Sequence, residues 1–142
     1  MQVLPPIKVY AMPITSFYAA LLALLFVALS VRTLRLRRHL RIAIGDAGNP
    51  QMLRAMRVHS NFAEYVPLSL VTLLLLEMQG AAAWLVHGLG LCLLCGRISH
   101  AYGVSQPKET FRFRIVGMAL TFATLVAAAS SLLAIAIHAL VS

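Results

Sequence analysis

Residues 13–31 read PITSFYAALLALLFVALSV, and this stretch decides the class of fold. No charged residue lies between Lys8 and Arg32. An α-helix needs about 20 mainly apolar residues to cross the roughly 30 Å of hydrocarbon in a bilayer. The stretch is therefore expected to be a transmembrane helix. A basic segment and a small-residue cleavage site are both missing ahead of it, so we expect an uncleaved span rather than a signal peptide.

The composition of the whole chain supports a membrane environment. Of the 142 residues, 61% are hydrophobic and 11% are charged, and the mean hydropathy is +0.86. Soluble domains carry about 25% charged residues. We expect one all-α domain over residues 1–142, an integral membrane four-helix bundle, with spans at about 12–31, 50–79, 81–102 and 111–138.

The positive charges predict an orientation. The chain has 12 lysines and arginines against 4 acidic residues, and most of the cations lie between the first and second spans or around Lys108, between the third and fourth. Because cytoplasmic loops are enriched in Lys and Arg, both termini are expected on the non-cytoplasmic side, in the inner membrane if the source is bacterial. The arginines of residues 32–41 fit two roles, contact with anionic lipid headgroups, which we favour, or steering of an anionic ligand.

The second span differs from the others because it begins with polar residues. Asn49 and Pro50 are typical of a helix start, as the N-cap and the first helical position. A helix from Pro50 to Gln79 would be about 45 Å long, more than the hydrocarbon needs. Only residues 65–76 are continuously uncharged, so Asn61 and Glu64 should lie in or near the hydrocarbon.

Several of these polar residues fall on one face of the second helix. Their spacing of i, i+3, i+7, i+10 and i+11 places them in one stripe: Arg54, Arg57, Asn61, Glu64 and Tyr65. Polar groups inside a membrane turn inward, pair and mark functional sites. The stripe could bind a zwitterionic, carboxylate-rich small molecule. It could equally form an internal Arg–Glu network that ties helices together.

Three other polar or helix-breaking positions have structural explanations. His59 falls outside the stripe and is expected to pack between helices. Pro67 lacks an N–H group and should kink the second helix. Glu77, near the end of that helix, is expected to pair with His87 at the start of the next one.

Two motifs resemble a known family. The longer is Arg54-x-x-Arg57-x-His59-x-Asn61-x-x-Glu64-Tyr65-x-Pro67, and the shorter is Arg97-x-x-His100. Together they resemble the MAPEG family, the membrane-associated proteins of eicosanoid and glutathione metabolism. The resemblance covers nearly the whole chain and is closest to a bacterial-type microsomal glutathione transferase, an enzyme class of detoxification.

The resemblance implies a homotrimer that binds glutathione between protomers near the cytoplasmic face. Several positions then match the family's glutathione-binding residues: Arg54, Arg57, Asn61, Glu64, Tyr65 and Arg97. The family also uses an arginine at the start of the fourth helix to stabilise the glutathione thiolate. The catalytic candidates are Arg112 and Arg114, of which Arg114 is favoured because it is closer to the apolar span.

The sequence therefore predicts a glutathione transferase or peroxidase that acts on lipophilic electrophiles. A thiol reacts as its thiolate, and a nearby arginine stabilises that anion. The expected partners are a second and third copy of the chain, the lipid bilayer and a lipophilic small molecule, with no nucleic acid and no metal. The alternative is a non-catalytic membrane protein that binds lipid or glutathione. A small exporter is disfavoured, because the first span carries no ionisable residue.

Overall fold

The computed structural model describes residues 12–107 and 111–141, which form four helices. These are α1 (Pro13–Leu40), α2 (Pro50–Met78), α3 (Ala83–Ser105) and α4 (Phe111–Val141). The expected all-α, four-helix architecture is confirmed. The expectations that concern Lys8 and Lys108 fall outside the described residues.

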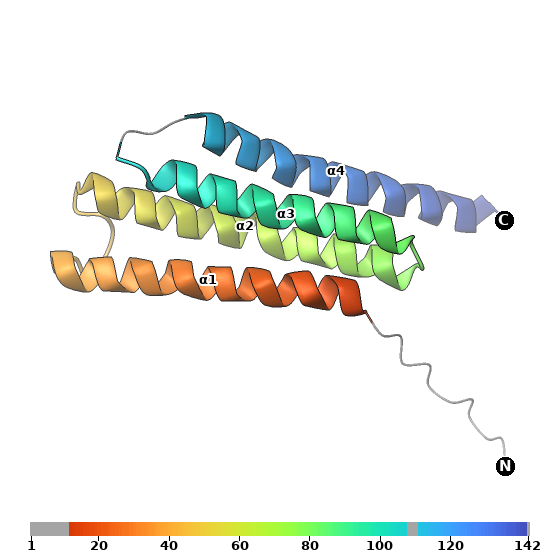
Figure 1. Cartoon of the computed structure of the whole chain (residues 1–142), viewed down its shortest axis with the longest axis horizontal. Helices are drawn as coiled ribbons and strands as arrows, with labels where there is room; N and C mark the ends of the chain where they lie inside the picture. Colours follow the sequence, from red (N-terminus) through yellow and green to blue (C-terminus); the bar gives the residue numbers. More distant parts are fainter. Residues whose placement is uncertain (1–11, 108–110, 142) are drawn as a thin grey trace, which may run out of the picture.

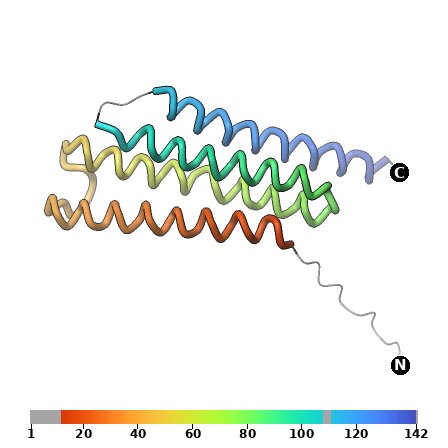
Figure 2. Tube along the Cα trace, in the orientation of Figure 1, coloured from red at the N-terminus to blue at the C-terminus, as the bar shows by residue number. Residues whose placement is uncertain are grey.

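The helices run alternately up and down, side by side (Figure 1). α2 and α3 form the middle of the bundle, and each contacts the other three helices. α1 and α4 lie on opposite sides of this central pair, each against both α2 and α3. The trace in Figure 2 shows that the α1–α2 and α3–α4 connections lie at one end and the α2–α3 turn at the other.

α1 continues past the end of the expected span, through the arginines, to Leu40. The expectation followed the charge-free residues alone, whereas arginine is a good helix former and extends the helix beyond the hydrocarbon. The residue that follows the helix, Arg41, caps it with a left-handed φ of 54°. Arg37 then holds the following loop, because its Nη1 donates to the Gly45 carbonyl at 2.9 Å.

The start of α1 is capped by another helix. The N-cap residue Met12 offers no side-chain hydrogen bond. Instead the Glu77 carboxylate, at the end of α2, accepts from Ile14 N at 3.0 Å and Thr15 N at 2.8 Å. A carboxylate is favourable there, because the first amides of a helix are unpaired and its N-terminus is positive.

The expected pairing of Glu77 with His87 is confirmed as an electrostatic attraction, but the hydrogen bonds of the carboxylate go to α1. Both carboxylate oxygens of Glu77 accept hydrogen bonds from α1 amides. The Nδ1 of His87 lies 3.4 Å from the Tyr18 hydroxyl. Spacing along the chain placed Glu77 at the correct end of the bundle. It gave no information about which helix end would meet the carboxylate.

Three helices are long and apolar enough to cross a membrane: α1, α2 and α4. α3 is not among them, although the sequence predicted four spans. Its polar residues include His87, Arg97 and His100, and it packs, like α2, against the other three helices. On the outer surface, large apolar side chains such as Leu24 and Val126 are 68% and 65% exposed. Such a surface is stable in hydrocarbon rather than in water.

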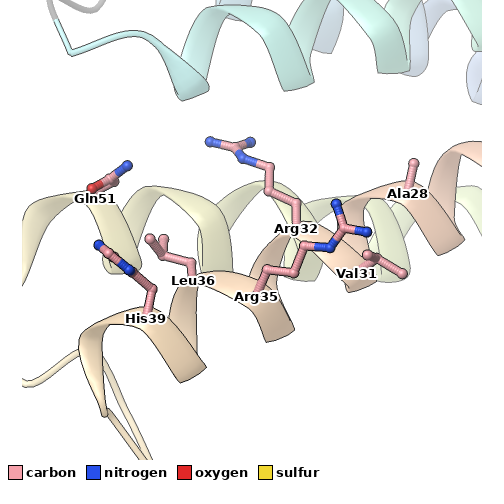
Figure 3. Close-up of a pocket in the computed structure, with 7 residues that line it drawn as sticks. All are labelled: Ala28, Val31, Arg32, Arg35, Leu36, His39 and Gln51. Atoms are coloured by element: carbon pink, nitrogen blue, oxygen red, sulfur yellow. The ribbon is translucent and has the colours of Figure 1, made fainter.

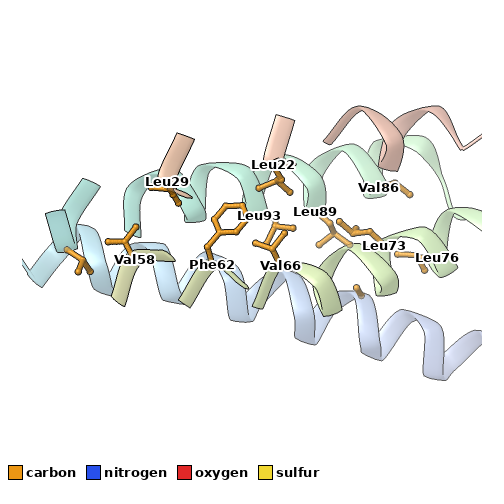
Figure 4. Packing of buried hydrophobic residues seen from close by; sticks show 12 residues of the cluster. Leu22, Leu29, Val58, Phe62, Val66, Leu73, Leu76, Val86, Leu89 and Leu93 are labelled. Carbon is orange, nitrogen blue, oxygen red and sulfur yellow. The ribbon is translucent and has the colours of Figure 1, made fainter. Parts of the chain in front are cut away.

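A continuous apolar core runs between α1, α2 and α3 (Figure 4). Leu22 and Leu29 enter it from α1. α2 contributes one apolar row at helical spacing: Val58, Phe62, Val66, Leu73 and Leu76. α3 faces them with Val86, Leu89 and Leu93. The α2 row lies on a different side of that helix from the polar stripe, so the stripe residues are not needed to form the apolar core.

α3 and α4 approach each other closely at glycines. A Cβ on Gly117 would lie 2.6 Å from the His100 backbone nitrogen, and one on Gly103 would lie 2.9 Å from the Arg114 nitrogen. Side chains at these positions would force the helices apart. Small residues of this kind let membrane helices pack backbone to backbone.

Gly117→Ala should therefore destabilise the protein, because the added methyl group meets backbone atoms that cannot move separately. We expect a loss of about 1–3 kcal/mol in the free energy of unfolding, measured by circular dichroism in detergent. Gly88→Ala is the matched control, because nothing lies within 4 Å of a Cβ at Gly88. Equal stability of the two variants would contradict the close α3–α4 contact.

Candidate functional site

The start of α2 is fixed by the two residues that the sequence singled out. The Asn49 side-chain oxygen accepts hydrogen bonds from Gln51 N and Met52 N, both at 3.0 Å, and Pro50 occupies the first turn. The predicted helix start is confirmed. Because this cap sets where the helix begins, it helps to fix which residues of α2 face α1 and which face α3 and α4.

His59 faces α1, away from the polar stripe. Its Nε2 lies 3.0 Å from the Ser30 hydroxyl, and its ring stacks on Phe26 with a centroid distance of 4.7 Å. The expectation that His59 packs between helices is confirmed.

The polar stripe borders a pocket of about 420 Å³ between α2, α3 and α4. Four of the predicted α2 residues line it together with one predicted catalytic residue: Arg54, Arg57, Asn61, Glu64 and Arg114. The other lining residues were not predicted from the sequence: Leu53, Ser60, His100 and Val104. The volume lies in the usual range for small-molecule sites.

Arg97 lies beneath this pocket rather than in its wall. Its side chain is 1% exposed, and its Nη2 donates to the Asn61 side-chain oxygen at 2.7 Å. Its Nε and Nη1 are also buried and have no hydrogen-bond partner within the described residues. Arg97 therefore adds positive charge below the pocket and orients Asn61, leaving the Asn61 amide nitrogen as its possible donor to a ligand.

Two further predicted residues do not line the pocket. Tyr65 is half-buried, and its ring packs edge-on against Phe122 of α4 with a centroid distance of 5.5 Å. Arg112 is exposed on α4 and is not among the lining residues. Residues two positions apart point to different sides of a helix, so Arg112 and Arg114 cannot both face the pocket.

Contacts between α3 and the first turn of α4 place Arg114 at the pocket. The Ser99 hydroxyl donates to the Phe113 carbonyl at 2.9 Å. The absence of a side chain on Gly103 lets the Arg114 backbone approach α3. The start of α4 is thereby held beside His100 and Val104, which line the same pocket.

Arg54 joins the pocket to the end of α3. Its Nη1 donates to the Gln106 carbonyl, at the C-cap of α3. Cations are favourable there, because the last carbonyls of a helix are unpaired and negative. Arg32 from α1 reaches the same region and donates to the Ser105 hydroxyl at 2.6 Å. The polar ends of α1, α2 and α3 are therefore tied together next to Arg54, which lines the pocket.

A family model described as MAPEG matches residues 15–134. This chain belongs to the MAPEG family. The MAPEG protein is similar to the inner membrane protein YecN of Escherichia coli strain K12, with 41% identity over 112 residues that cover 79% of this chain and 84% of YecN. YecN of strain CFT073 is similar to the same extent. The resemblance seen in the sequence is confirmed, and the chain is a membrane protein.

The pocket of this MAPEG protein combines three cationic side chains with one carboxylate. Arg54, Arg57 and Arg114 can bind carboxylates or a thiolate, and Glu64 can accept a hydrogen bond from an ammonium group. His100 and Ser60 add polar atoms that the sequence analysis did not assign. Both could have been predicted from the sequence. His100 is the last residue of the Arg97-x-x-His100 motif, and Ser60 lies at i+3 from Arg57, next to the stripe.

Asn61→Leu should destabilise this MAPEG protein even without ligand. The substitution leaves the buried Arg97 guanidinium without the acceptor that it has now, which should cost about 3 kcal/mol in the free energy of unfolding. Thermal unfolding in detergent would measure the loss. Ser60→Ala, at the neighbouring wall of the pocket, is the control and should change stability little. An unchanged Asn61→Leu protein would show that Arg97 does not depend on Asn61.

Proposed function

We propose that this MAPEG protein is a glutathione-dependent membrane enzyme, a transferase or peroxidase that acts on lipophilic electrophiles. The observation that carries the proposal is the pocket in which Arg54, Arg57, Asn61 and Glu64 of α2 meet Arg114 of α4. These residues belong to the set that the MAPEG resemblance associates with glutathione.

The chemistry of the pocket supports glutathione as the cosubstrate. Glutathione carries two carboxylates, one ammonium group and one thiol. Arg54 and Arg57 offer planar guanidinium groups that can each hold a carboxylate by two hydrogen bonds. Glu64 complements the ammonium group, and the Asn61 amide can donate to a peptide carbonyl. One arginine of the lining, Arg114, then remains for the thiol.

Arg114 would activate the cosubstrate by stabilising its anionic form. A free thiol has a pKa of about 8.5, so only a small fraction is thiolate at neutral pH. A guanidinium within hydrogen-bond reach favours the thiolate, and the effect grows where water is scarce. The thiol proton leaves to solvent. In a transfer reaction the sulfur then bonds to an electrophilic carbon, and the leaving group departs with its electron pair.

The surroundings of the pocket support a lipophilic second substrate. The outer faces of the helices are apolar, and a separate apolar groove of about 310 Å³ lies between α1 and α2, on the other side of α2 from the pocket. An electrophile dissolved in hydrocarbon would therefore meet the protein at high local concentration. The protein would supply proximity and one charge partner, while glutathione supplies the nucleophile.

The exposure of the stripe supports assembly as a homotrimer. Arg57 and Glu64 are exposed in the single chain although they line the pocket. Charged groups at this depth are stable when protein or water covers them rather than lipid. A neighbouring protomer would provide that cover and close the pocket around the ligand.

Arg57→Ala and Glu64→Gln should each weaken glutathione binding about 10- to 100-fold, measured by calorimetry. Each substitution leaves a charged group of the ligand without its partner, and hydrogen bonds to charged groups contribute about 1.5–3 kcal/mol. Arg38→Ala removes an exposed arginine of α1 that does not line the pocket, so it should bind like the wild type.

Native mass spectrometry of the same sample should find the ligand on trimers. Tight binding by a monomer would contradict a site shared between protomers. Equal losses of glutathione affinity in Arg38→Ala and Arg57→Ala would indicate that binding depends only on the net charge of the protein. That result would contradict recognition at the pocket.

Arg114→Ala should raise the pKa of bound glutathione towards that of the free thiol, while Arg112→Ala should not. Thiolate absorbs near 240 nm, so a pH titration of that band in the presence of saturating glutathione measures the ionisation directly. Turnover of a chromogenic electrophile at neutral pH should fall more than binding does, because only the thiolate reacts.

Three results would contradict parts of this assignment. A thiolate titration that neither variant shifts would remove Arg114 from the mechanism. A larger shift of the thiol pKa in Arg112→Ala than in Arg114→Ala would assign thiolate stabilisation to Arg112 instead of Arg114. Tight glutathione binding without turnover of any electrophile would favour the alternative, a non-catalytic binding protein.

A further inference from the structure

A second cationic pocket of about 590 Å³ lies along α1 (Figure 3). Its polar lining comes from Arg32, Arg35 and His39 of α1 and from Gln51 at the start of α2. Figure 3 shows Arg32 pointing towards α3, while the Arg35 side chain extends along α1. None of the residues that line this pocket lines the one beside α4.

The same pocket has an apolar wall on the side that leads into the membrane. Ala28 and Val31 line it, and Leu24, one turn before Ala28, is 68% exposed. Leu24, Ala28, Val31 and Arg35 follow the spacing i, i+4, i+7 and i+11, so they form one face of α1. This face is apolar for two turns and then cationic.

The change from apolar to cationic occurs at the depth of the lipid headgroups. The charge-free part of α1, residues 13–31, has a helical length of about 28 Å, close to the thickness of the hydrocarbon layer. Arg32 and Arg35 follow immediately. A ligand held there has its charge at the interface and its apolar part beside Val31 and Leu24.

We propose that this pocket binds an anionic phospholipid. The guanidinium groups of Arg35 and Arg32, with the His39 ring and the Gln51 amide, hold the phosphate headgroup, and one acyl chain lies along Val31, Ala28 and Leu24. Arg32 is fixed by its hydrogen bond to Ser105, whereas Arg35 and His39 are exposed and free to turn towards the headgroup. Charges that serve only to orient the protein need no grouping beside an apolar groove.

The chain offers a matched comparison for this proposal. Arg38 and Arg41 are exposed arginines of the same basic segment, but neither lines the pocket. Arg35→Gln and Arg38→Gln therefore remove the same charge from the same end of α1. Arg32 is unsuitable for the test, because its loss would also disturb the α1–α3 contact at Ser105.

The experiment titrates the full-length protein in mild detergent with phosphatidylglycerol and, separately, with phosphatidylcholine, and counts bound lipids by native mass spectrometry. The wild type should bind phosphatidylglycerol at least tenfold more tightly than phosphatidylcholine. Arg35→Gln should weaken phosphatidylglycerol binding about fivefold, and adding His39→Gln should weaken it further. Arg35→Lys should retain most of the affinity, and Arg38→Gln all of it.

Four outcomes would overturn the proposal. They are equal binding of the two lipids, equal losses in Arg35→Gln and Arg38→Gln, displacement of phosphatidylglycerol by millimolar inorganic phosphate, and no lipid bound by the wild type. The third would identify the pocket as a site for a free anion, and the fourth would indicate that another chain closes it. Glutathione binding should be unchanged in Arg35→Gln, so the lipid site and the proposed enzymatic function can fail independently.

Discussion

The buried guanidinium of Arg97 is the constraint on which the polar half of this protein depends. A cation that is 1% exposed inside a membrane bundle needs acceptors from protein, and the one seen here is the side-chain oxygen of Asn61 on α2. That requirement fixes α3 against the polar face of α2. It also explains why α3 is too polar to count as a span by composition. The helix can carry Arg97 because this side chain points into the bundle, while apolar side chains such as Leu91 and Ile98 occupy the exposed face of α3.

The contact between α3 and α4 has the opposite character, because it depends on the absence of side chains. Gly117 and Gly103 let the two backbones meet, and Ser99 anchors the first turn of α4. Packing of this kind tolerates little sliding, so the position of Arg114 is determined by glycines on both helices. Arg114 thus owes its place at the pocket to residues that do not themselves line the pocket.

Features that depend on a single helix could be predicted from the sequence, whereas features that depend on how two helices pack together could not. Helical spacing alone placed Arg54, Arg57, Asn61 and Glu64 on one face, and the Asn49-Pro50 pair marked the start of α2. Spacing could not choose between Arg112 and Arg114, because the choice follows from how α4 lies on Gly103. For the same reason, spacing indicated that His87 lies near Glu77 but did not reveal the α1 amides that bind its carboxylate. Hydropathy marked only the charge-free part of α1, whereas the helix itself continues through the arginines to Leu40.

The Glu77 carboxylate has a consequence for how the protein is made. The first amides of α1 emerge early in synthesis, but the carboxylate that pairs with them belongs to the last turn of α2. Until α2 has crossed the bilayer, those amides depend on water or lipid headgroups at the far surface. The cap therefore favours α1 and α2 as a helical hairpin that becomes stable as one unit during insertion. It also holds the start of α1 and the end of α2 at a common depth.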